Sequence, residues 1–285
     1  MSYGVISSRY PRLMHRLGYL VDGWKRVGAQ ARFYAKTLGA SRAAVIYYKA
    51  ETLRMIAQMG LGAGALAIVG GTVGIVGFLT LSAGSLIAIQ GYSSLSGIGV
   101  EALTGFVSAY FNGRVVTPLT AVIALSATIG AGTTAQLGAM RISEEIDALE
   151  VMGVRSIAYL ASTRVIAGVI VVIPLYCIAL WMSFVAARFA ATSGYGQPTG
   201  VYDHYFSTFL QPTDILWSLF QAVLMGLVVM LIHTYYGFTA AGGPAGVGEA
   251  VGRAVRTSLV AAVFVILFAS LAIYGQTGDF QFSGA

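Results

Sequence analysis

The stretch Ser143-Glu-Glu-Ile-Asp-Ala-Leu-Glu-Val-Met-Gly153 holds four of the chain's 11 acidic residues and lies between two hydrophobic runs, each long enough to cross a bilayer. At 100° per residue on a helix, Ile146, Leu149 and Met152 share one side. The opposite side carries acidic residues, namely Glu144, Asp147 and Glu150. The stretch is therefore predicted to form one short amphipathic helix.

Ser143 suits the N-cap of this helix, the carboxylates suit the positive end of its dipole, and Gly153 suits a left-handed C-terminal stop. These features predict a short helix over 143–152, on an intracellular loop, that docks on a soluble partner. The alternative is a helix in the membrane interface, but such helices favour Lys and Arg on their polar face. The residues expected to meet the partner are Glu144, Glu145, Ile146, Asp147, Leu149, Glu150 and Met152.

The composition is that of a membrane protein. Hydrophobic residues make up 57% of the chain and charged residues 10%, whereas a soluble domain carries about 25% charged residues. We therefore predict an all-α integral membrane protein, in which the 36 glycines allow close helix packing. Residues 1–54 are polar and basic, so no signal peptide is expected. The single cysteine, Cys177, excludes a disulfide within the chain and a metal site of several cysteines.

Hydrophobic runs predict five crossings, at about 56–89, 118–140, 157–187, 214–238 and 250–274. The first run would be about 50 Å long as one helix, more than the bilayer core of about 30 Å, so it must tilt, protrude or break near glycines such as Gly70 and Gly71. Asn112-Gly113-Arg114 interrupts the second run and Thr117-Pro118 signals a new helix, which makes 98–111 a short interfacial or re-entrant piece. Pro174 is expected to kink the third crossing.

The 17 Lys and Arg residues orient the chain. Ten precede residue 55, three lie in 141–164 and two are Arg253 and Arg256, so five crossings with a cytoplasmic N-terminus place all of these inside. A sixth crossing at 98–111 would put the acidic helix outside and split the charges. We expect a multi-pass protein of the inner or plasma membrane with an extracytoplasmic C-terminus. The distribution of its net charge of +6 does not indicate nucleic acid.

Three regions follow: a basic amphipathic region at 1–54, a membrane domain at 55–276 and an extracytoplasmic tail at 277–285. The first region is expected to form an N-terminal helix in the inner-leaflet interface, held by anionic lipid, and the alternative is a basic tail with an occasional helical turn. Its apolar residues recur at helical spacing, at Leu13, Leu17, Leu20, Trp24 and Val27.

The chain lacks the motifs that nucleotide hydrolysis or catalysis would need. It has no G-x-x-x-x-G-K-[ST] phosphate loop, and the glycine cluster at 242–248 lacks the Lys and hydroxyl of such a loop. His15, His204 and His233 have no partner at metal or triad spacing. For His233, inside a crossing, an imidazole bonded to neighbouring backbone is favoured over a proton relay. No enzyme activity, metal or cofactor is expected on this chain.

Few polar groups are placed at membrane depth. An ion-coupled carrier usually needs ionisable groups near the midplane, and the chain offers no convincing set. An intracellular docking helix without an ATPase or ion-coupling groups predicts a permease driven by a separate nucleotide-hydrolysing subunit. The polar candidates are Gln90, Glu101, Arg114, Gln136 and Gln221.

A long motif surrounds the acidic helix: Gln136-Leu-Gly-Ala-Met-Arg-Ile-Ser-Glu-Glu-Ile-Asp-Ala-Leu-Glu-Val-Met-Gly-Val154. It resembles the coupling-helix signature of the MlaE/YrbE permeases, which belong to ABC transporters that work with MCE proteins. The resemblance covers residues 50–275. Shorter matches are Leu53-Arg-Met-Ile-Ala-Gln-Met-Gly60, Ile89-Gln-Gly-Tyr92 and Gly246-Val-Gly-Glu-Ala-Val-Gly-Arg-Ala-Val255.

The chain departs from that family at several charges. Many members carry Arg-Glu-Leu-Gly-Pro where this chain has Gly113-Arg-Val-Val-Thr-Pro118. Many also carry an Arg and a Glu that are missing from Ser126-Ala-Thr-Ile-Gly-Ala-Gly132 and Thr134-Ala-Gln136. The lost charges put any role assigned to them in doubt and hint at one of two diverged permeases. The basic N-terminus and the outer-loop tyrosines are similar to the B-type YrbE member of an actinobacterial pair (Tyr195, Tyr202 and Tyr205).

The resemblance implies a lipid transporter for phospholipids, fatty acids or sterols, with import the direction favoured in actinobacteria. Its other parts would be a second YrbE-type permease, two cytoplasmic ABC ATPases that bind ATP and Mg, and an extracytoplasmic MCE assembly. The glycine-rich first crossing is the expected contact with the second permease. The candidate substrate path comprises Leu66, Val69, Val73, Phe78, Gln90, Tyr92 and Glu101, and for its apolar positions simple helix packing is the alternative.

Two other functions stay open. One is a non-transporting membrane scaffold that anchors an extracytoplasmic complex. The other is a secondary carrier that transports without ATP.

Overall fold

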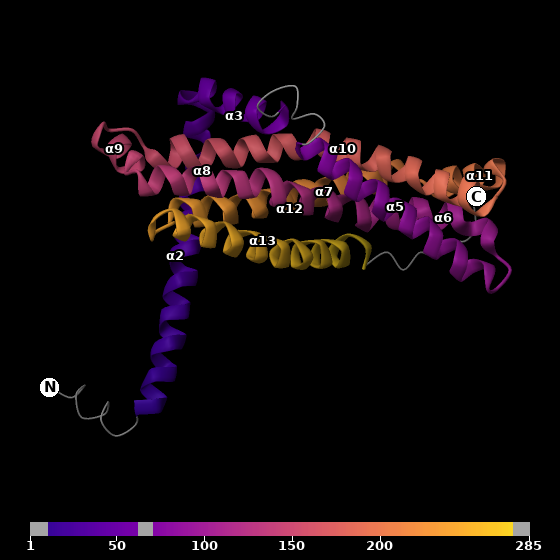
Figure 1. Ribbon diagram of the computed structural model, residues 1–285, viewed down its shortest axis with the longest axis horizontal. Coiled ribbons are helices and arrows are strands. Elements are labelled where there is room, and N and C mark those ends of the chain that lie inside the picture. The colour runs from indigo at the N-terminus through magenta and orange to yellow at the C-terminus, as the bar shows by residue number, and fades with distance from the viewer. Residues whose placement is uncertain (1–10, 62–70, 276–285) are drawn as a thin grey trace.

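The computed structural model describes residues 11–61 and 71–275, and every regular element within these ranges is helical. Helices α2 (Pro11–Tyr47) and α3 (Lys49–Leu61) precede a bundle of long helices (Figure 1). The other elements are α5 (Thr72–Ser96), η1 (Glu101–Leu103), α6 (Thr104–Val107), η2 (Ser108–Val116), α7 (Thr117–Leu125), η3 (Ser126–Gly130), α8 (Ala131–Ile142), α9 (Glu145–Val151), η4 (Ile157–Ser162), α10 (Thr163–Phe189), η5 (Ala190–Gly194), α11 (Thr199–Phe209), α12 (Pro212–Phe238) and α13 (Gly243–Tyr274).

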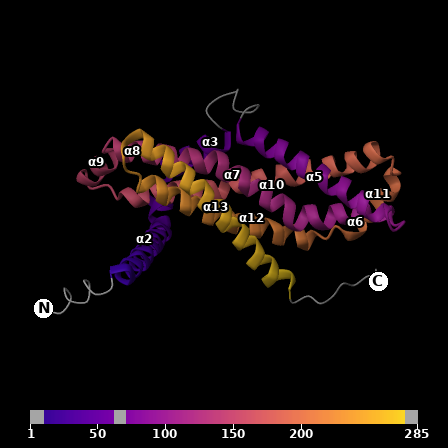
Figure 2. The ribbon, with the colours of Figure 1, turned by 60° about the horizontal axis from the view of Figure 1, so that its bottom comes forward.

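By length and composition, five helices of the described ranges can cross a membrane, which confirms the predicted class and number of crossings. Helices α8, α10 and α12 run side by side along the long axis (Figure 1), and α13 crosses them obliquely (Figure 2). The second crossing has 42 residues and is about 63 Å long at 1.5 Å per residue, so its ends extend beyond a hydrocarbon core of about 30 Å. The five crossings are Thr72–Ser96, Glu101–Ile142, Ile157–Gly194, Pro212–Phe238 and Gly243–Tyr274.

The first crossing differs from the predicted span at 56–89. It is α5, which begins directly after Gly71, so the chain does start a new helix at one of the glycines expected to allow a break. The N-terminal part of the predicted span belongs to α3, a separate helix that packs on α10 through residues such as Ile56 and Met59. Residues 62–70 lie outside the described ranges.

The second crossing corrects the prediction for 98–111. From Glu101 to Ile142 the chain is one continuous helix, so residues 101–111 are not a separate piece and no new helix begins at Thr117. The helix passes the Asn-Gly-Arg sequence in wide π-helical turns, in which the Thr117 N–H bonds to the carbonyl of Asn112, five residues back. The Gly113 carbonyl accepts instead from Ser218 Oγ of α12 at 2.5 Å. The wide turns also give room to the ring of Pro118, which would otherwise press on the preceding turn.

A stripe of glycines joins α5 to its neighbours within the chain. Gly77, Gly84 and Gly91 recur every seven residues, and a Cβ on them would press on Met182, Ser183 and Val107 respectively. The contact at Gly84 is with the backbone of Ser183, so α5 and α10 approach too closely there for any side chain. The glycines expected to face a second permease therefore pack against other helices of the same chain.

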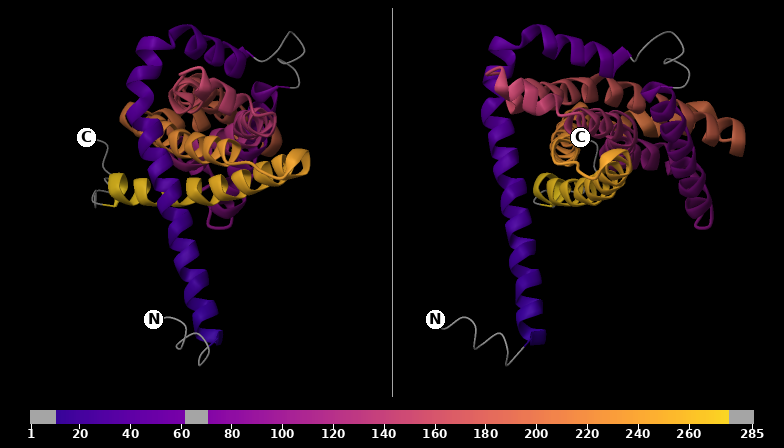
Figure 3. Two further views of the ribbon diagram at one scale, coloured as in Figure 1. Left: turned by 90° about the vertical axis from the view of Figure 1, so that its left-hand side faces the viewer. Right: turned by 60° about the vertical axis from the view of Figure 1, so that its left-hand side comes forward.

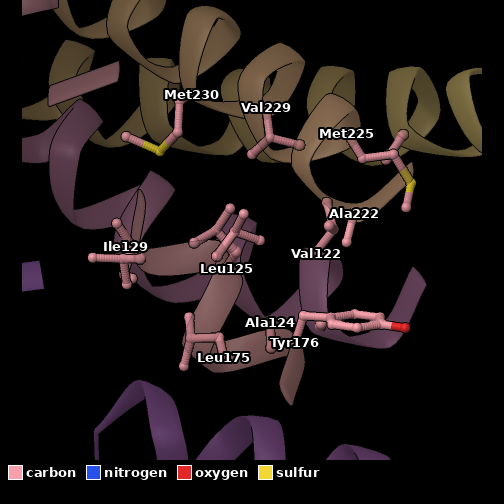
Figure 4. Close-up of a cluster of buried hydrophobic side chains, with 14 of the residues drawn as sticks. Val122, Ala124, Leu125, Ile129, Leu175, Tyr176, Ala222, Met225, Val229 and Met230 are labelled. Atoms are coloured by element: carbon pink, nitrogen blue, oxygen red, sulfur yellow. The ribbon is translucent and has the colours of Figure 1, made fainter. Parts of the chain in front are cut away.

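The main core lies where the second crossing, α10 and α12 meet (Figure 4). Leu125 of α7 and Val122 lie between Leu175 of α10 and Val229 of α12. These side chains are at most 3% exposed in the isolated chain, so the three helices form one packed unit.

Helix α2 runs across the bundle instead of along it (Figure 3). It is held near the end that carries α9, where the Phe33 ring meets the rings of Tyr235 and Phe238, each at a centroid distance of 5.5 Å. Ser162 Oγ also donates to the carbonyl of Thr37 at 2.7 Å. The N-terminal part of α2 extends beyond the bundle (Figure 1).

Candidate functional site

The predicted helix of the acidic stretch is present as α9, at one end of the bundle between the second and third crossings (Figure 1). It covers Glu145–Val151, slightly less than the predicted 143–152. Gly153, with φ 78°, ends it in the left-handed conformation as predicted, and the Val154 N–H returns to the carbonyl of Leu149 at 3.0 Å.

The predicted N-cap is wrong. Ser143 ends the preceding helix: its Oγ bonds to the carbonyl of Ala139 at 3.0 Å and to Glu145 Oε1 at 2.9 Å. Glu144 occupies the N-cap with φ 61°, a left-handed conformation that costs a non-glycine residue on the order of 1 kcal/mol. The turn from α8 to α9 thus takes two residues, and the direction of α9 is set by the direction of the second crossing.

Ile146 fixes α9 to its own chain. It is completely buried against Leu137 of α8 and Leu160 of η4, and Leu149 is half-buried beside it. Val151 and Met152, by contrast, are 89% and 69% exposed. The predicted apolar side of the helix is therefore divided into a part that packs on the bundle and a part that is exposed. Ile146 is not accessible to a partner, whereas Met152 is, because the helix ends at Val151 and the chain turns away.

The four carboxylates of the stretch are all exposed. Asp147 Oδ1 accepts from Arg141 Nη1 at 2.5 Å, and Glu150 Oε1 accepts from Ser156 Oγ at 2.5 Å. Glu144 has no hydrogen bond or ion pair to its carboxylate from any part of the chain that the structure describes. Acidic groups and the exposed Val151 and Met152 together form a compact surface at this end of the bundle, called here the α9 surface.

The predicted substrate path is not brought together into one site. Leu66 and Val69 lie outside the described ranges. Val73 is half-buried against the main core and Phe78 is 72% exposed, so the two point in different directions. At the far end of α5, Tyr92 stacks on Tyr195 at 4.4 Å. The half-buried Glu101 follows at the start of the second crossing.

The exposed face of α5 changes character along the helix. Near its start the face carries large apolar side chains such as Ile75 and Phe78. Farther along, Leu86 and Ile89 are followed by exposed serines in the last turns, and Gln90 Nε2 bonds to Ser94 Oγ at 3.3 Å. A purely lipid-facing helix would not need these hydroxyls and the amide, so this face suits a protein or substrate contact. The exposed serines are Ser82, Ser93, Ser94 and Ser96.

A buried polar cluster joins three crossings and was not predicted. The His233 ring of α12 bonds to Thr134 Oγ1 at 2.8 Å, Ser126 Oγ at 3.1 Å and Ser258 Oγ at 3.2 Å. The side-chain partners are hydroxyls of other helices, not the neighbouring backbone that the sequence led us to expect. Gly130 makes room for the ring, since a Cβ there would lie 2.6 Å from Cδ2. The three hydroxyls lie on two other crossings, far from His233 in the sequence, and so they leave no sequence signal for such a cluster.

The opposite end of the bundle is held by ion pairs. Arg114 of the second crossing pairs with Asp214 in the first turn of α12, and its guanidinium lies 4.0 Å from the ring centroid of Tyr110. Arg188 bonds to both carboxylate oxygens of Asp203 in α11 at 2.8 Å. This hydrogen bonding lowers the pKa of the Asp203 carboxyl. The described residues contain no group of three or more His, Cys, Asp or Glu that could hold a metal ion.

The fold and the α9 surface define a class of protein: a multi-pass, all-helical membrane protein with a short amphipathic helix between its second and third crossings. The family model for the MlaE permease matches residues 61–272, and the chain belongs to this family. It is accordingly a permease subunit of an ABC transporter.

Three relatives illustrate the similarity. A probable ABC transporter permease of Synechocystis is 29% identical over 58% of this chain, which spans 63% of that relative's length. A probable ABC transporter permease of Rickettsia bellii is 28% identical over 65% of this chain and 72% of its own. The chloroplastic protein TRIGALACTOSYLDIACYLGLYCEROL 1 of Arabidopsis thaliana is 28% identical over 69% of this chain and 56% of its own.

Proposed function

We propose that the chain is the membrane subunit of an ABC-type lipid transporter and that its α9 surface receives the force of a cytoplasmic ATPase. The observation that carries this proposal is the way in which α9 packs on the bundle. Ile146 anchors the helix to the bundle while the carboxylates, Val151 and Met152 face outward. A rigidly held projection is what a separate motor subunit needs, and ATP and Mg would bind on that subunit.

Lipid is the proposed cargo for two reasons. The Arabidopsis relative is named for trigalactosyldiacylglycerol, which is a lipid. In addition, the exposed face of α5 combines Phe78, Leu86 and Ile89 with a few hydroxyls. Such a surface can accompany an acyl chain and its polar end but offers little to an ion or a sugar. Gln90, Tyr92 and Glu101 lie at or beyond the far end of this helix, where a headgroup would emerge.

The transporter would need partners on three sides. A second YrbE-type permease would cover the exposed face of α5, an ATPase dimer would bind the α9 surfaces, and MCE proteins would sit at the end that carries α11. The N-terminus would be cytoplasmic, because α2 is held at the end of the bundle that carries α9. The same proposal includes fatty acids among the transported lipids and import as the direction of transport.

The test is co-purification from the native host followed by ATP-dependent lipid transfer in proteoliposomes. Glu144→Lys with Glu145→Lys, and separately Val151→Arg, should lose the ATPase and the transfer while the membrane domain keeps its thermal stability. The matched control exchanges the exposed pair at the start of α13, Glu249→Arg with Arg253→Glu, and should retain both. ATPase recovery at the wild-type level from the α9 variants would refute the proposed docking.

The same assay separates the alternative functions. A membrane scaffold would keep its extracytoplasmic partners and show no lipid transfer with ATP. A secondary carrier would transfer lipid in vesicles that lack the ATPase. Transfer that needs both ATP and an intact α9 surface supports the permease.

A further inference from the structure

The second crossing carries a row of buried polar side chains whose hydrogen-bonding atoms have no partner in the chain. Ser108, Asn112 and Thr117 are completely buried. Four of their atoms, Ser108 Oγ, Asn112 Oδ1, Asn112 Nδ2 and Thr117 Oγ1, make no hydrogen bond to any residue that the structure describes. A buried polar group without a partner destabilises a fold, so these atoms point to a partner from outside the chain.

The π-helical turns place the three side chains on one side of the helix. The Thr117 N–H bonds to the carbonyl of Asn112, five residues back, and in such a ladder residues four and five apart face the same way. At 100° per residue an α-helix would instead turn Thr117 about 140° away from Asn112. Burial follows the π-helical spacing, with buried pairs at 108–109, 112–113 and 117–118 and exposed side chains at Phe111 and Val115.

Thr117 lacks its usual acceptor for a visible reason. A threonine inside a helix commonly returns its hydroxyl to the carbonyl four residues back, as Thr80 and Thr234 do here at 2.8 Å. For Thr117 that carbonyl belongs to Gly113, and it accepts from Ser218 Oγ of α12. The Thr117 hydroxyl is therefore left free inside the protein.

A fourth hydroxyl extends the row from another helix. Tyr202 of α11 is only 1% exposed, and its hydroxyl lies close enough to the Ser108 side chain to interact with it. Neither hydroxyl completes a hydrogen bond of good geometry, however. Helix α11 is fixed against this segment, because a Cβ on Gly105 would collide with the Tyr202 carbonyl. The two hydroxyls therefore face each other without closing the gap between them.

The interior is also less tightly packed here than elsewhere in the bundle. A Cβ built on the buried Gly113 would have one neighbour within 4 Å, Phe184 Cζ at 3.9 Å. At the buried Gly84 and Gly130, by contrast, a Cβ would lie 2.8 Å or less from the nearest atoms. Beside Asn112 there is thus room for a group of about the size of a methyl.

We propose that this end of the bundle, opposite α9 (Figure 1), binds ordered water among Ser108, Asn112, Thr117 and Tyr202. A buried water usually makes about three hydrogen bonds and both donates and accepts, which matches a row of hydroxyls and one amide. A divalent cation favours carboxylates, and the row contains none. The bound water would join α11 to the π-helical segment. The proposal does not depend on what the chain transports.

The first test is hydroxyl-radical footprinting of the full-length protein in nanodiscs. An X-ray pulse produces radicals from water in place, so a tyrosine beside bound water is oxidised even when it is buried. Tyr202 should be oxidised. Tyr176 is the matched control, because it is equally buried but its hydroxyl donates to the carbonyl of Ile215, and it should stay unmodified. The variant Asn112→Leu should lose the oxidation of Tyr202.

A second test uses a substitution that keeps the side-chain shape. Thr117→Val removes the hydroxyl alone. Removing an unpartnered hydroxyl would raise the thermal unfolding midpoint, whereas removing one that holds water should lower it, by about 2–4 °C. The control Thr234→Val removes a hydroxyl that bonds only within its own helix and should change the midpoint less.

Three results would overturn the proposal: Tyr202 as resistant to radicals as Tyr176, a midpoint that does not fall in Thr117→Val more than in Thr234→Val, or modification of Tyr202 by N-acetylimidazole. The last result would mean that bulk solvent, and not bound water, reaches the ring. None of these readouts requires transport or a partner subunit, so they stand apart from the test of the proposed function.

Discussion

Arg114 and Asp214, one hundred residues apart in sequence, form a bonded ion pair in which Nη2 and Nε lie 2.7 and 3.0 Å from the same carboxylate oxygen. Both side chains are less than 20% exposed, and the guanidinium lies near the rings of Tyr110 and Tyr274. The pair connects the second crossing to the start of α12 at the end of the bundle opposite α9. The Asn112-Gly113-Arg114 segment, whose sequence predicts an interruption of the hydrophobic run, thus connects two crossings through Arg114.

Replacing Asp214 with Asn should destabilise the protein by about 2 kcal/mol, because the change leaves a largely buried guanidinium without its counter-charge. The thermal unfolding midpoint in detergent measures the effect, and Arg114→Gln with Asp214→Asn completes a double-mutant cycle. Additive losses in that cycle would show that the two residues do not stabilise each other.

The second ion pair predicts a pH dependence. Hydrogen bonds from Arg188 lower the pKa of Asp203 in the folded chain, so the pair's contribution is present above the carboxyl's unfolded pKa of about 4 and is lost as pH falls through the lower folded value. Wild type should exceed Asp203→Asn in stability at pH 7, and the difference should shrink as the pH falls below the unfolded pKa of about 4 toward the lower folded pKa. Both side chains are about half exposed, so the difference is small. A gap that widens in acid would contradict this assignment.

In α9, neighbouring apolar residues should behave differently. Ile146→Ala should cost about 2–4 kcal/mol of local stability and raise amide exchange throughout 145–151, because it empties a buried position. Val151→Ala, at an exposed position, should change stability by less than about 0.5 kcal/mol and act on partner binding alone. Hydrogen exchange and ATPase co-purification distinguish the two. Equal exchange in both variants would mean that Ile146 does not hold the helix.

The His233 cluster gives a prediction with its own rescue. Gly130→Ala should destabilise by about 1–3 kcal/mol, because the new methyl group meets the imidazole ring. His233→Ala should lose the three hydroxyl contacts at roughly 0.6 kcal/mol each. The double variant should be more stable than the sum of the two losses predicts. Simple additivity would show that the methyl clashes with something else.

Much of the fold could be predicted because hydrophobic length and the distribution of Lys and Arg are one-dimensional signals. They fixed five crossings and the place of α9. The segment 98–111 was misread because Asn112-Gly113 and Thr117-Pro118 are turn signals in water, whereas here π-helical turns and Ser218 of α12 satisfy the backbone. Ser143 was misread as an N-cap because the same hydroxyl can also close the preceding helix.

The candidate site was predicted in outline and not in its orientation. Charge spacing located the acidic face, but only tertiary packing decides that Ile146 points into the bundle and Met152 away from it. The glycines of α5 were recognised as packing residues without their partner, because sequence does not distinguish a contact with α10 from one with another chain.

The unbroken second crossing has a consequence for how this chain tolerates change. Inserting one residue between Thr104 and Ile142 would turn everything beyond it by about 100° and advance it by about 1.5 Å. Depending on its position, such an insertion would separate Arg114 from Asp214, Ser126 from His233, or Ile146 of α9 from the residues it packs on. The number of residues in this helix is therefore constrained by the contacts along it, and insertions are expected to be accepted only in the connections on either side of it.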